Sequence, residues 1–384
     1  MRAPEAGHPS GSGRERPTAL VGLALCLALA ILVCFVSNNL NSRFQHHNDS
    51  VAQQFALISG DPLLFDGRDL GLREWRSRIL FPLTLVTVSR VSPSLSPGQW
   101  FLLLRLAAAF GAFASFWFVV RKTIRGDVRL AAAGLFLLAY QLIFSFNEGW
   151  ENTTDFPEVA FGALFLWALV GKRRWWLVGL VLLATLNREV SVFAGLIWLI
   201  LYGLGRRVSV RIKEVVFGVG LSVMAYAEAF VVRAIMTRPP SGAAPALEGA
   251  VGSLGTRPDP GYMGQLTHAI GFWNRVSYDV SAFLRHPTAT EWPVLWVAML
   301  TPAVIWIWLN WHWMRPVHRR LLLATACLFP ITLAYGTPGE IREYITPMVM
   351  LAYVAVALEG ERSRSASLPV EPAYETPARE PVEV

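Results

Sequence analysis

The chain has 384 residues, of which 54% are hydrophobic and 16% are charged. A soluble domain cannot bury so large a share of apolar residues in one core, so the composition excludes an ordinary water-soluble protein and predicts a chain solvated by lipid. The formal charge of +7 does not indicate a nucleic-acid partner, because the basic residues form short clusters between apolar runs, which is the pattern of membrane topology.

Apolar runs near the length of about 20 residues that a helix needs to cross a bilayer predict an all-α polytopic membrane protein with about ten transmembrane helices. Residues 1–17 are polar and basic, and we expect a disordered cytoplasmic N-terminus before an uncleaved signal anchor. The membrane domain covers residues 18–358, and the polar residues 359–384 are predicted to be a disordered cytoplasmic tail. The predicted spans are 18–37, 100–120, 128–146, 156–171, 174–187, 190–204, 213–233, 292–311, 319–335 and 343–359.

The basic residues predict the side of each loop, because lysine and arginine concentrate in short cytoplasmic loops. If the N-terminus is cytoplasmic, alternation of inner and outer loops places every basic loop in the cytoplasm and the acidic loops outside. The outer loops include the long ones at 38–99 and 234–291. Arginine outnumbers lysine thirty-one to three, as in GC-rich bacteria, so we expect a bacterial inner (plasma) membrane with both termini cytoplasmic. The cytoplasmic basic clusters are Arg121 to Arg125, Lys172 to Arg174, Arg206 to Lys213 and Arg315 to Arg320.

Two apolar stretches depart from a simple span. Ile79 to Val91 would cover about 20 Å as a helix, which is too short to cross, so we predict an interfacial or re-entrant segment in the first outer loop. The second stretch, 175–204, is interrupted by Arg188 and Glu189. Charges at that depth are expected where they line a cavity or pair with each other, so a functional cavity and a structural Arg–Glu pair both stay open.

Acidic residues of the outer loops are candidate catalytic or binding groups. Asp49 follows the first span, and a partly desolvated carboxylate can act as a general base on a hydroxyl. Glu151 and Asp155 belong to an acidic loop for which a plain solvated turn is an equal alternative. The adjacent His46 and His47 would face different directions on a helix and predict no metal site. No cofactor is expected, and a requirement for a divalent metal stays open.

Arginine residues on the same side are candidates for binding phosphate, because a guanidinium group makes bidentate contacts with phosphate oxygens. Arg76 and Arg78 precede the interfacial segment, where snorkelling to lipid headgroups is the alternative. Arg342 opens the last span beside Glu340. A cation is unfavourable at a helix N-terminus, so Arg342 is expected to have an anionic partner, either Glu189 or a ligand phosphate.

Four short motifs follow one another along the chain: Asp49, Arg78 to Pro82, Asn187 to Glu189 and Glu340 to Pro347. Their succession, over about residues 18–358, resembles bacterial membrane glycosyltransferases of the GT-C superfamily. The resemblance implies an inverting hexosyl or pentosyl transfer from a polyprenyl-phosphate donor to an acceptor hydroxyl on the non-cytoplasmic face. It also implies that Asp49 activates the acceptor and that Arg78, Arg188 and Arg342 bind the leaving phosphate. The single acid at position 49 departs from the doubled acid that this family often shows.

Two other functions remain open. A transporter or flippase for an anionic lipid or sugar would use Arg188 and Arg342 as its substrate site, but the chain lacks the inverted repetition typical of that class. A non-catalytic protein of the same fold is also compatible with the single Asp49. The expected partners are the lipid bilayer, a polyprenyl-phosphate-linked sugar and an unidentified acceptor, without nucleic acid. The predicted phosphate-binding residues are Arg76, Arg78, Arg188 and Arg342, supported by the acidic residues Glu151, Asp155, Glu189 and Glu340.

Overall fold

The computed structural model describes residues 12–40, 79–124, 128–145, 155–204, 208–236, 292–335 and 344–367. Within these ranges the chain forms helices and no strand, which confirms the all-α prediction. The α-helices are α1 (Ser12–Leu40), α3 (Leu80–Val91), α4 (Pro97–Thr123), α5 (Val128–Ser145), α6 (Asp155–Val170), α7 (Arg174–Thr185), α8 (Ala194–Trp198), α9 (Val208–Met236), α13 (Trp292–Leu309), α14 (Pro316–Tyr335) and α15 (Ile345–Ser367). Short turns of other helix types are η4 (Glu189–Phe193), η5 (Leu199–Gly203) and η6 (Trp311–Trp313).

Each of the ten predicted spans contains helical structure within its described residues. Among the described residues, four helices are long and apolar enough to cross a membrane: Thr18–Val36, Gly98–Thr123, Val128–Ser145 and Arg211–Val232. Shorter apolar helices are Arg174–Thr185, Ser191–Gly203 and Val294–Leu309. These helices are typical of a membrane protein, while the count of ten spans stays a prediction.

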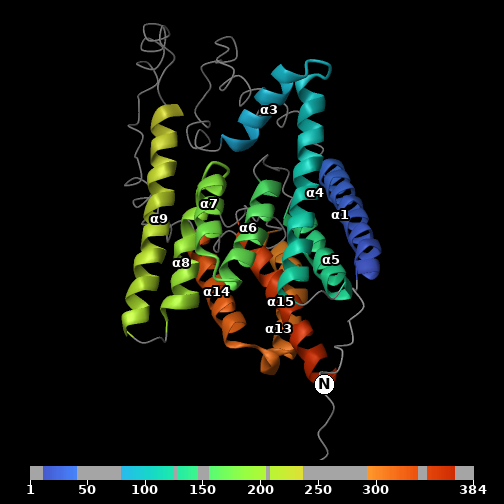
Figure 1. Ribbon diagram of the computed structural model, residues 1–384. Helices are drawn as coiled ribbons and strands as arrows, with labels where there is room; N and C mark the ends of the chain where they lie inside the picture. The colour runs from blue at the N-terminus through green and yellow to red at the C-terminus, as the bar shows by residue number, and fades with distance from the viewer. Residues whose placement is uncertain are drawn as a thin grey trace, which may run out of the picture.

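Helices α1 and α9 lie at opposite flanks of the bundle (Figure 1), and both have exposed large apolar side chains. On α1, Leu20 and Phe35 are exposed, and on α9, Val216 and Phe230 are exposed. Contiguous apolar surface of this kind is unfavourable in water and marks contact with a membrane or another protein. The exposed faces of α1 and α9 therefore fit a chain that is solvated by lipid.

The centre of the bundle is α15, which packs against α4, α5, α6, α13 and α14. Every residue from Tyr344 to Leu358 is buried, so α15 has no polar face over this length. A helix that is apolar on all sides is stable where other helices surround it, which explains its central position. On the opposite side of this core, α4 packs against α1, α5 and α6.

The predicted interfacial segment is the helix α3, which lies obliquely across one end of the bundle instead of running along it (Figure 1). Its apolar residues Phe81 and Leu85 are buried together with Phe101 of α4, and the Phe81 and Phe101 rings meet edge to face at 5.8 Å. A capping box of Ser96 and Gln99 then starts α4. We call this end of the bundle, where α6 and α15 also begin, the α3 end.

The two short spans predicted around the Asn-Arg-Glu turn form a helical hairpin with a break at Arg188. Helix α7 ends at Thr185, and Arg188 adopts an extended backbone with φ −162° and ψ 143°. The chain then returns through the 3₁₀ turn η4, the single α-turn α8 and the π-helical η5. A side chain at Gly195 would overlap the carbonyl oxygen of Gly218 and the hydroxyl of Ser222, so glycine permits α8 to lie against α9.

Both ends of the described chain are more helical than predicted. Helix α1 begins at Ser12, within the segment expected to be disordered, and α15 continues to Ser367, beyond the expected end of the last span at position 359. Ion pairs stabilise the extension of α15, because Glu361 lies 2.5 Å from Arg315 and 3.3 Å from Arg364. Residues 359–367 are therefore helical, and the remainder of the predicted tail lies outside the described residues.

Candidate functional site

A buried group of charged side chains lies at the α3 end of the bundle. Nη1 of Arg188 is 2.5 Å from Oε2 of Glu158 and 3.4 Å from Oδ1 of Asp155. The hydroxyl of Thr346 donates a hydrogen bond to Oε1 of Glu158 at 3.1 Å. Arg188 and Glu158 are 4% exposed and Asp155 is 0% exposed, so these charges are removed from solvent. We call the four residues the Arg188 cluster.

Three helix ends position the side chains of the Arg188 cluster. Asp155 and Glu158 occupy the first turn of α6, where their three-residue spacing puts both on one face and the helix dipole favours negative charge. Arg188 belongs to the break after α7, and Thr346 belongs to the first turn of α15. The cluster thus joins segments that are as many as 188 positions apart in the sequence.

Further hydrogen bonds brace the break that carries Arg188. The hydroxyl of Ser191 donates to the carbonyl oxygen of Arg188 at 3.2 Å and lies 2.7 Å from the hydroxyl of Thr185. The backbone N–H of Leu80, at the start of α3, donates to the carbonyl oxygen of Leu186 at 3.0 Å. The first turn of α3 is therefore fastened to the same break as the Arg188 cluster.

Two of the predicted site residues, Asp155 and Arg188, are described and are brought together in the Arg188 cluster. Glu189 begins η4, but its side chain lies outside the described part of the structure. The predicted structural pair of Arg188 with Glu189 therefore stays a prediction, and the described partners of Arg188 are Asp155 and Glu158 on α6. The predicted residues that lie outside the described ranges are Asp49, Arg76, Arg78, Glu151, Glu340 and Arg342.

The described contacts set Arg188 against two carboxylates. Its guanidinium group lies within 3.4 Å of both Asp155 and Glu158, and burial strengthens the electrostatic interactions there. Among the described residues, no three His, Cys, Asp or Glu side chains are grouped to hold a metal ion. Arg188 therefore orders two carboxylates in this arrangement.

Two buried polar side chains add hydrogen-bonding groups at the same end. Gln141 and Ser145 lie one turn apart near the end of α5, and the connection from α5 leads to the start of α6. Within the described ranges, the amide of Gln141 and the hydroxyl of Ser145 have no hydrogen-bond partner. Buried polar groups are normally paired, so these two are available to a ligand or to another segment of the chain.

Comparisons with known proteins were made with family models, curated proteins and solved structures. None matches this chain. The resemblance to GT-C glycosyltransferases therefore rests on its four short motifs. The contacts at the α3 end are a property of the structure and do not rest on any sequence similarity.

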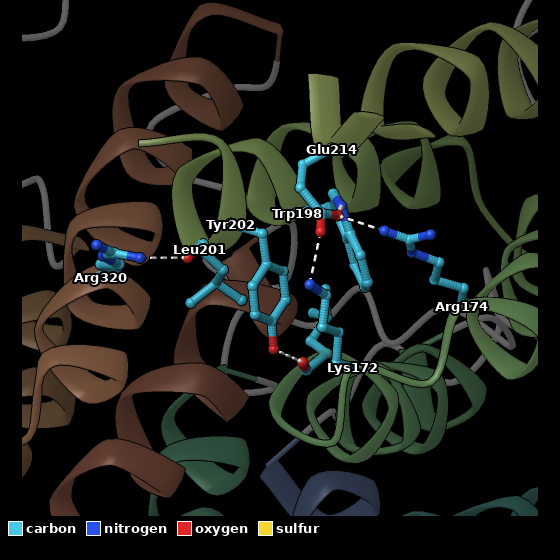
Figure 2. A network of polar contacts seen from close by, with 8 residues as sticks. Lys172, Arg174, Trp198, Leu201, Tyr202, Glu214 and Arg320 are labelled. Carbon is cyan, nitrogen blue, oxygen red and sulfur yellow. Dashed lines mark hydrogen bonds and ion pairs between the residues drawn. The ribbon is translucent and has the colours of Figure 1, made fainter. Parts of the chain in front are cut away.

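A second buried charge lies at the opposite end of α6, about 24 Å away along a helix of 16 residues. Glu214 of α9 is 2% exposed and accepts hydrogen bonds from Lys172 at 2.6 Å and from the indole N–H of Trp198 at 3.0 Å. Nη2 of Arg174 lies 3.0 Å from the second oxygen of the same carboxylate (Figure 2). We call Glu214, Lys172, Arg174 and Trp198 the Glu214 network.

Neighbouring contacts fix the π-helical turn η5 beside the Glu214 network. The hydroxyl of Tyr202 donates to the carbonyl oxygen of Leu169, and Arg320 donates to the carbonyl oxygen of Leu201 at 2.8 Å (Figure 2). Arg211 donates to the carbonyl oxygen of Gly203 at 3.3 Å. Carbonyl groups at the end of this turn thus have cationic donors, as expected at a helix C-terminus.

Sequence reasoning missed several residues of both networks. Glu158 could have been found, because it follows Asp155 at the spacing that places two residues on one helix face. Glu214 also gave a signal, since it is an acid in a predicted span, directly after the basic cluster Arg206 to Lys213. Thr346 and Trp198 gave none, because an isolated threonine or tryptophan in an apolar helix has no distinguishing pattern.

Proposed function

We propose that the protein is a membrane glycosyltransferase that moves a sugar from a polyprenyl-phosphate donor to an acceptor hydroxyl on the non-cytoplasmic face. One observation carries the proposal. The starts of α3, α6 and α15 and the break after α7 meet around Arg188 at one end of an apolar bundle. A buried polar centre in such a bundle is expensive, and it is typical of a functional site.

The reaction would divide its steps among separate groups. Asp49 takes the proton of the acceptor hydroxyl, the acceptor oxygen forms a bond to the anomeric carbon, and the bond from that carbon to the phosphate oxygen breaks with inversion. The departing polyprenyl phosphate carries the charge. Arg76, Arg78 and Arg342 stabilise it, because electrostatic stabilisation of developing charge is strong where water is scarce.

The Arg188 cluster would act as the framework of this site. Arg188 already contacts two carboxylates, so we assign the phosphate to arginines that adjoin the framework in the sequence. Arg78 directly precedes Ile79, and Arg342 is separated from Tyr344 by one residue. The framework thus holds the helix starts from which both candidate phosphate ligands extend.

The acceptor or the donor sugar would use the uncharged groups at this end. Sugar recognition requires hydrogen-bond donors and acceptors that are fixed in place, and the buried amide of Gln141 supplies both. Glu158 adds a carboxylate that is already oriented by Thr346 and Arg188. We propose that Gln141 and Glu158 contact sugar hydroxyls.

The test is transfer of a labelled sugar from a polyprenyl-phosphate donor in membranes that contain the full chain. Asp49→Asn should abolish transfer while leaving the amount of folded protein unchanged, and Asp66→Asn, in the same predicted outer loop, is the matched control. Gln141→Leu should weaken binding of the sugar substrate more than it lowers the maximal rate. Full activity of Asp49→Asn would overturn its assignment as the base.

A transporter for an anionic lipid or sugar is the second candidate, and the irregular helical segment from η4 to η5 favours it. Discontinuous helices with 3₁₀ and π turns often form substrate sites in transporters. Purified protein in proteoliposomes separates the two candidates. Substrate counterflow without any covalent product would support transport, whereas product formation without counterflow would support the transferase.

A further inference from the structure

The connection between α6 and α7 contains a lysine in a backbone conformation that normally belongs to glycine. Within the described ranges, Lys172 is the only non-glycine residue with a positive φ, and its φ is 53°. The N–H of Arg173 donates to the carbonyl oxygen of Ala168 at 2.8 Å, and the N–H of Lys172 donates to that of Leu169 at 3.1 Å. This pair of bonds is the Schellman motif, whose left-handed position usually holds glycine.

Contacts of the Lys172 side chain offset the cost of its unfavourable backbone conformation. Its ammonium group lies 2.6 Å from Glu214 and 5.0 Å from the centre of the Tyr202 ring. Arg174 approaches the same carboxylate and lies over the Trp198 ring at 5.8 Å. The buried carboxylate and the rings thus hold both cations in fixed positions (Figure 2).

The cationic side chains held by Glu214 are still partly exposed to solvent. The side chains of Lys172 and Arg174 are 38% and 42% exposed, whereas Glu214 is 2% exposed. Arg173, between them, is also exposed, with its guanidinium group 4.0 Å above the centre of the Trp167 ring. Within the described ranges, Lys172 and Arg174 share the single carboxylate of Glu214 and Arg173 has no ion-pair partner, so positive charge is in excess at this surface.

Two exposed tryptophans follow the three cations directly. Trp175 is 87% exposed and Trp176 is 63% exposed at the start of α7, next to the apolar part of that helix. Tryptophan concentrates at the level of lipid headgroups, where its ring is apolar and its N–H is hydrated. Aromatic anchors beside uncompensated cations match the chemistry of an anionic phospholipid, which has a charged phosphate above an apolar chain.

We propose that Lys172, Arg173 and Arg174 form a binding site for the headgroup of an anionic phospholipid. The phosphate contacts the exposed faces of the three cations, and Trp175 and Trp176 contact the glycerol region and upper acyl chain. Glu214 acts from below as a positioning residue that holds Lys172 and Arg174 in place. The site is distinct from the Arg188 cluster and does not depend on the proposed transferase activity.

The test measures the binding of phosphatidylglycerol and of phosphatidylcholine to the purified full-length protein by native mass spectrometry. Wild-type protein should retain phosphatidylglycerol preferentially, and the preference should decrease as ionic strength rises. Arg173→Gln removes one charge without touching Glu214, and it should weaken phosphatidylglycerol binding about fivefold. Arg90→Gln removes an exposed charge at the α3 end and is the matched control, which should bind like wild type.

A second variant separates lipid binding from folding. Lys172→Gly relaxes the left-handed turn, so the protein should remain folded, but it removes the ammonium group and should also weaken phosphatidylglycerol binding. Equal retention of the two lipids by wild type would overturn the proposal, as would an Arg173→Gln variant that binds like Arg90→Gln. Displacement of phosphatidylglycerol by millimolar inorganic phosphate would assign the site to a soluble anion and would also overturn it.

Discussion

Arg188 and Glu158 are joined by a side-chain contact of 2.5 Å, and both residues are 4% exposed. The partners lie on different helices, 30 positions apart in the sequence. Removing one partner of a buried pair leaves a charge without compensation, whereas removing all charges does not. Substitution of Arg188 alone and substitution of all the charged residues of the cluster should therefore have different effects on stability.

Arg188→Met should lower the free energy of unfolding by about 3–5 kcal/mol, because Asp155 and Glu158 would remain buried without their cation. Thermal unfolding in detergent micelles measures the effect. The triple variant Arg188→Met, Asp155→Leu and Glu158→Met should regain most of the lost stability, since it replaces the charges with apolar groups. A single variant as stable as wild type would contradict the assignment of this cluster as a charged framework.

The close approach of α8 to α9 can be tested with two glycines. Gly195→Ala should destabilise the protein by about 1–3 kcal/mol, because its methyl group would overlap the Gly218 carbonyl and the Ser222 hydroxyl. Gly179→Ala is the matched control in α7, where a methyl group meets no atom within 4 Å. It should be neutral or stabilising by as much as about 1 kcal/mol, because alanine favours helix. The melting temperatures of both variants are compared with that of the wild type. Equal shifts in melting temperature would contradict the close approach of α8 to α9.

Glu214→Leu tests the network at the other end of α6. The indole N–H of Trp198 would lose its acceptor, while Lys172 and Arg174 could still reach water, so we expect a loss of about 1–3 kcal/mol in the free energy of unfolding. Glu361→Gln affects the ion pair with Arg315, which is 55% exposed, and it should change stability by less than about 1 kcal/mol. A smaller effect for Glu214→Leu than for Glu361→Gln, in denaturant titrations, would be inconsistent with a buried network.

The proposed topology places the turn between α3 and α4 outside and the end of α15 in the cytoplasm. Ser94 and Ser365 are exposed at these two places. In a chain without its native cysteines, a membrane-impermeant maleimide should label Ser94→Cys in intact cells. The same reagent should label Ser365→Cys only after the cells are permeabilised. Labelling of both positions in intact cells would exclude the odd number of spans that is predicted between Ser94 and Ser365.

The positions of the helices could be predicted because each depends on a local property. An apolar run such as 128–146 has no charge after Arg129, and the helix Val128–Ser145 matches the run within one residue. The shortness of Ile79 to Val91 likewise indicated a segment that does not run along the bundle. By contrast, the 3₁₀ and π turns after Arg188 depend on how closely α8 meets α9, and no local pattern in the sequence reports that distance.

The candidate site was predictable in part. Arg188 stood out because a charge within an apolar stretch is unfavourable, and Asp155 stood out within an acidic loop. Their contact with each other did not follow from either pattern, and the same is true of the hydrogen bond between Thr346 and Glu158. The side chains of Asp49, Arg78 and Arg342 lie outside the described residues, so their place at the site stays a prediction.

The sequence by itself determined that this protein is helical and apolar enough for a membrane, and it indicated which positions carry unusual charges. These properties depend on composition and on neighbouring residues, so they can be derived from the order of residues alone. Only the tertiary structure decided which charges are paired: Arg188 with Asp155 and Glu158, and Glu214 with Lys172 and Arg174. The reason is physical, since the energy of a buried charge depends on the few ångströms to its partner, and packing of distant segments sets that distance.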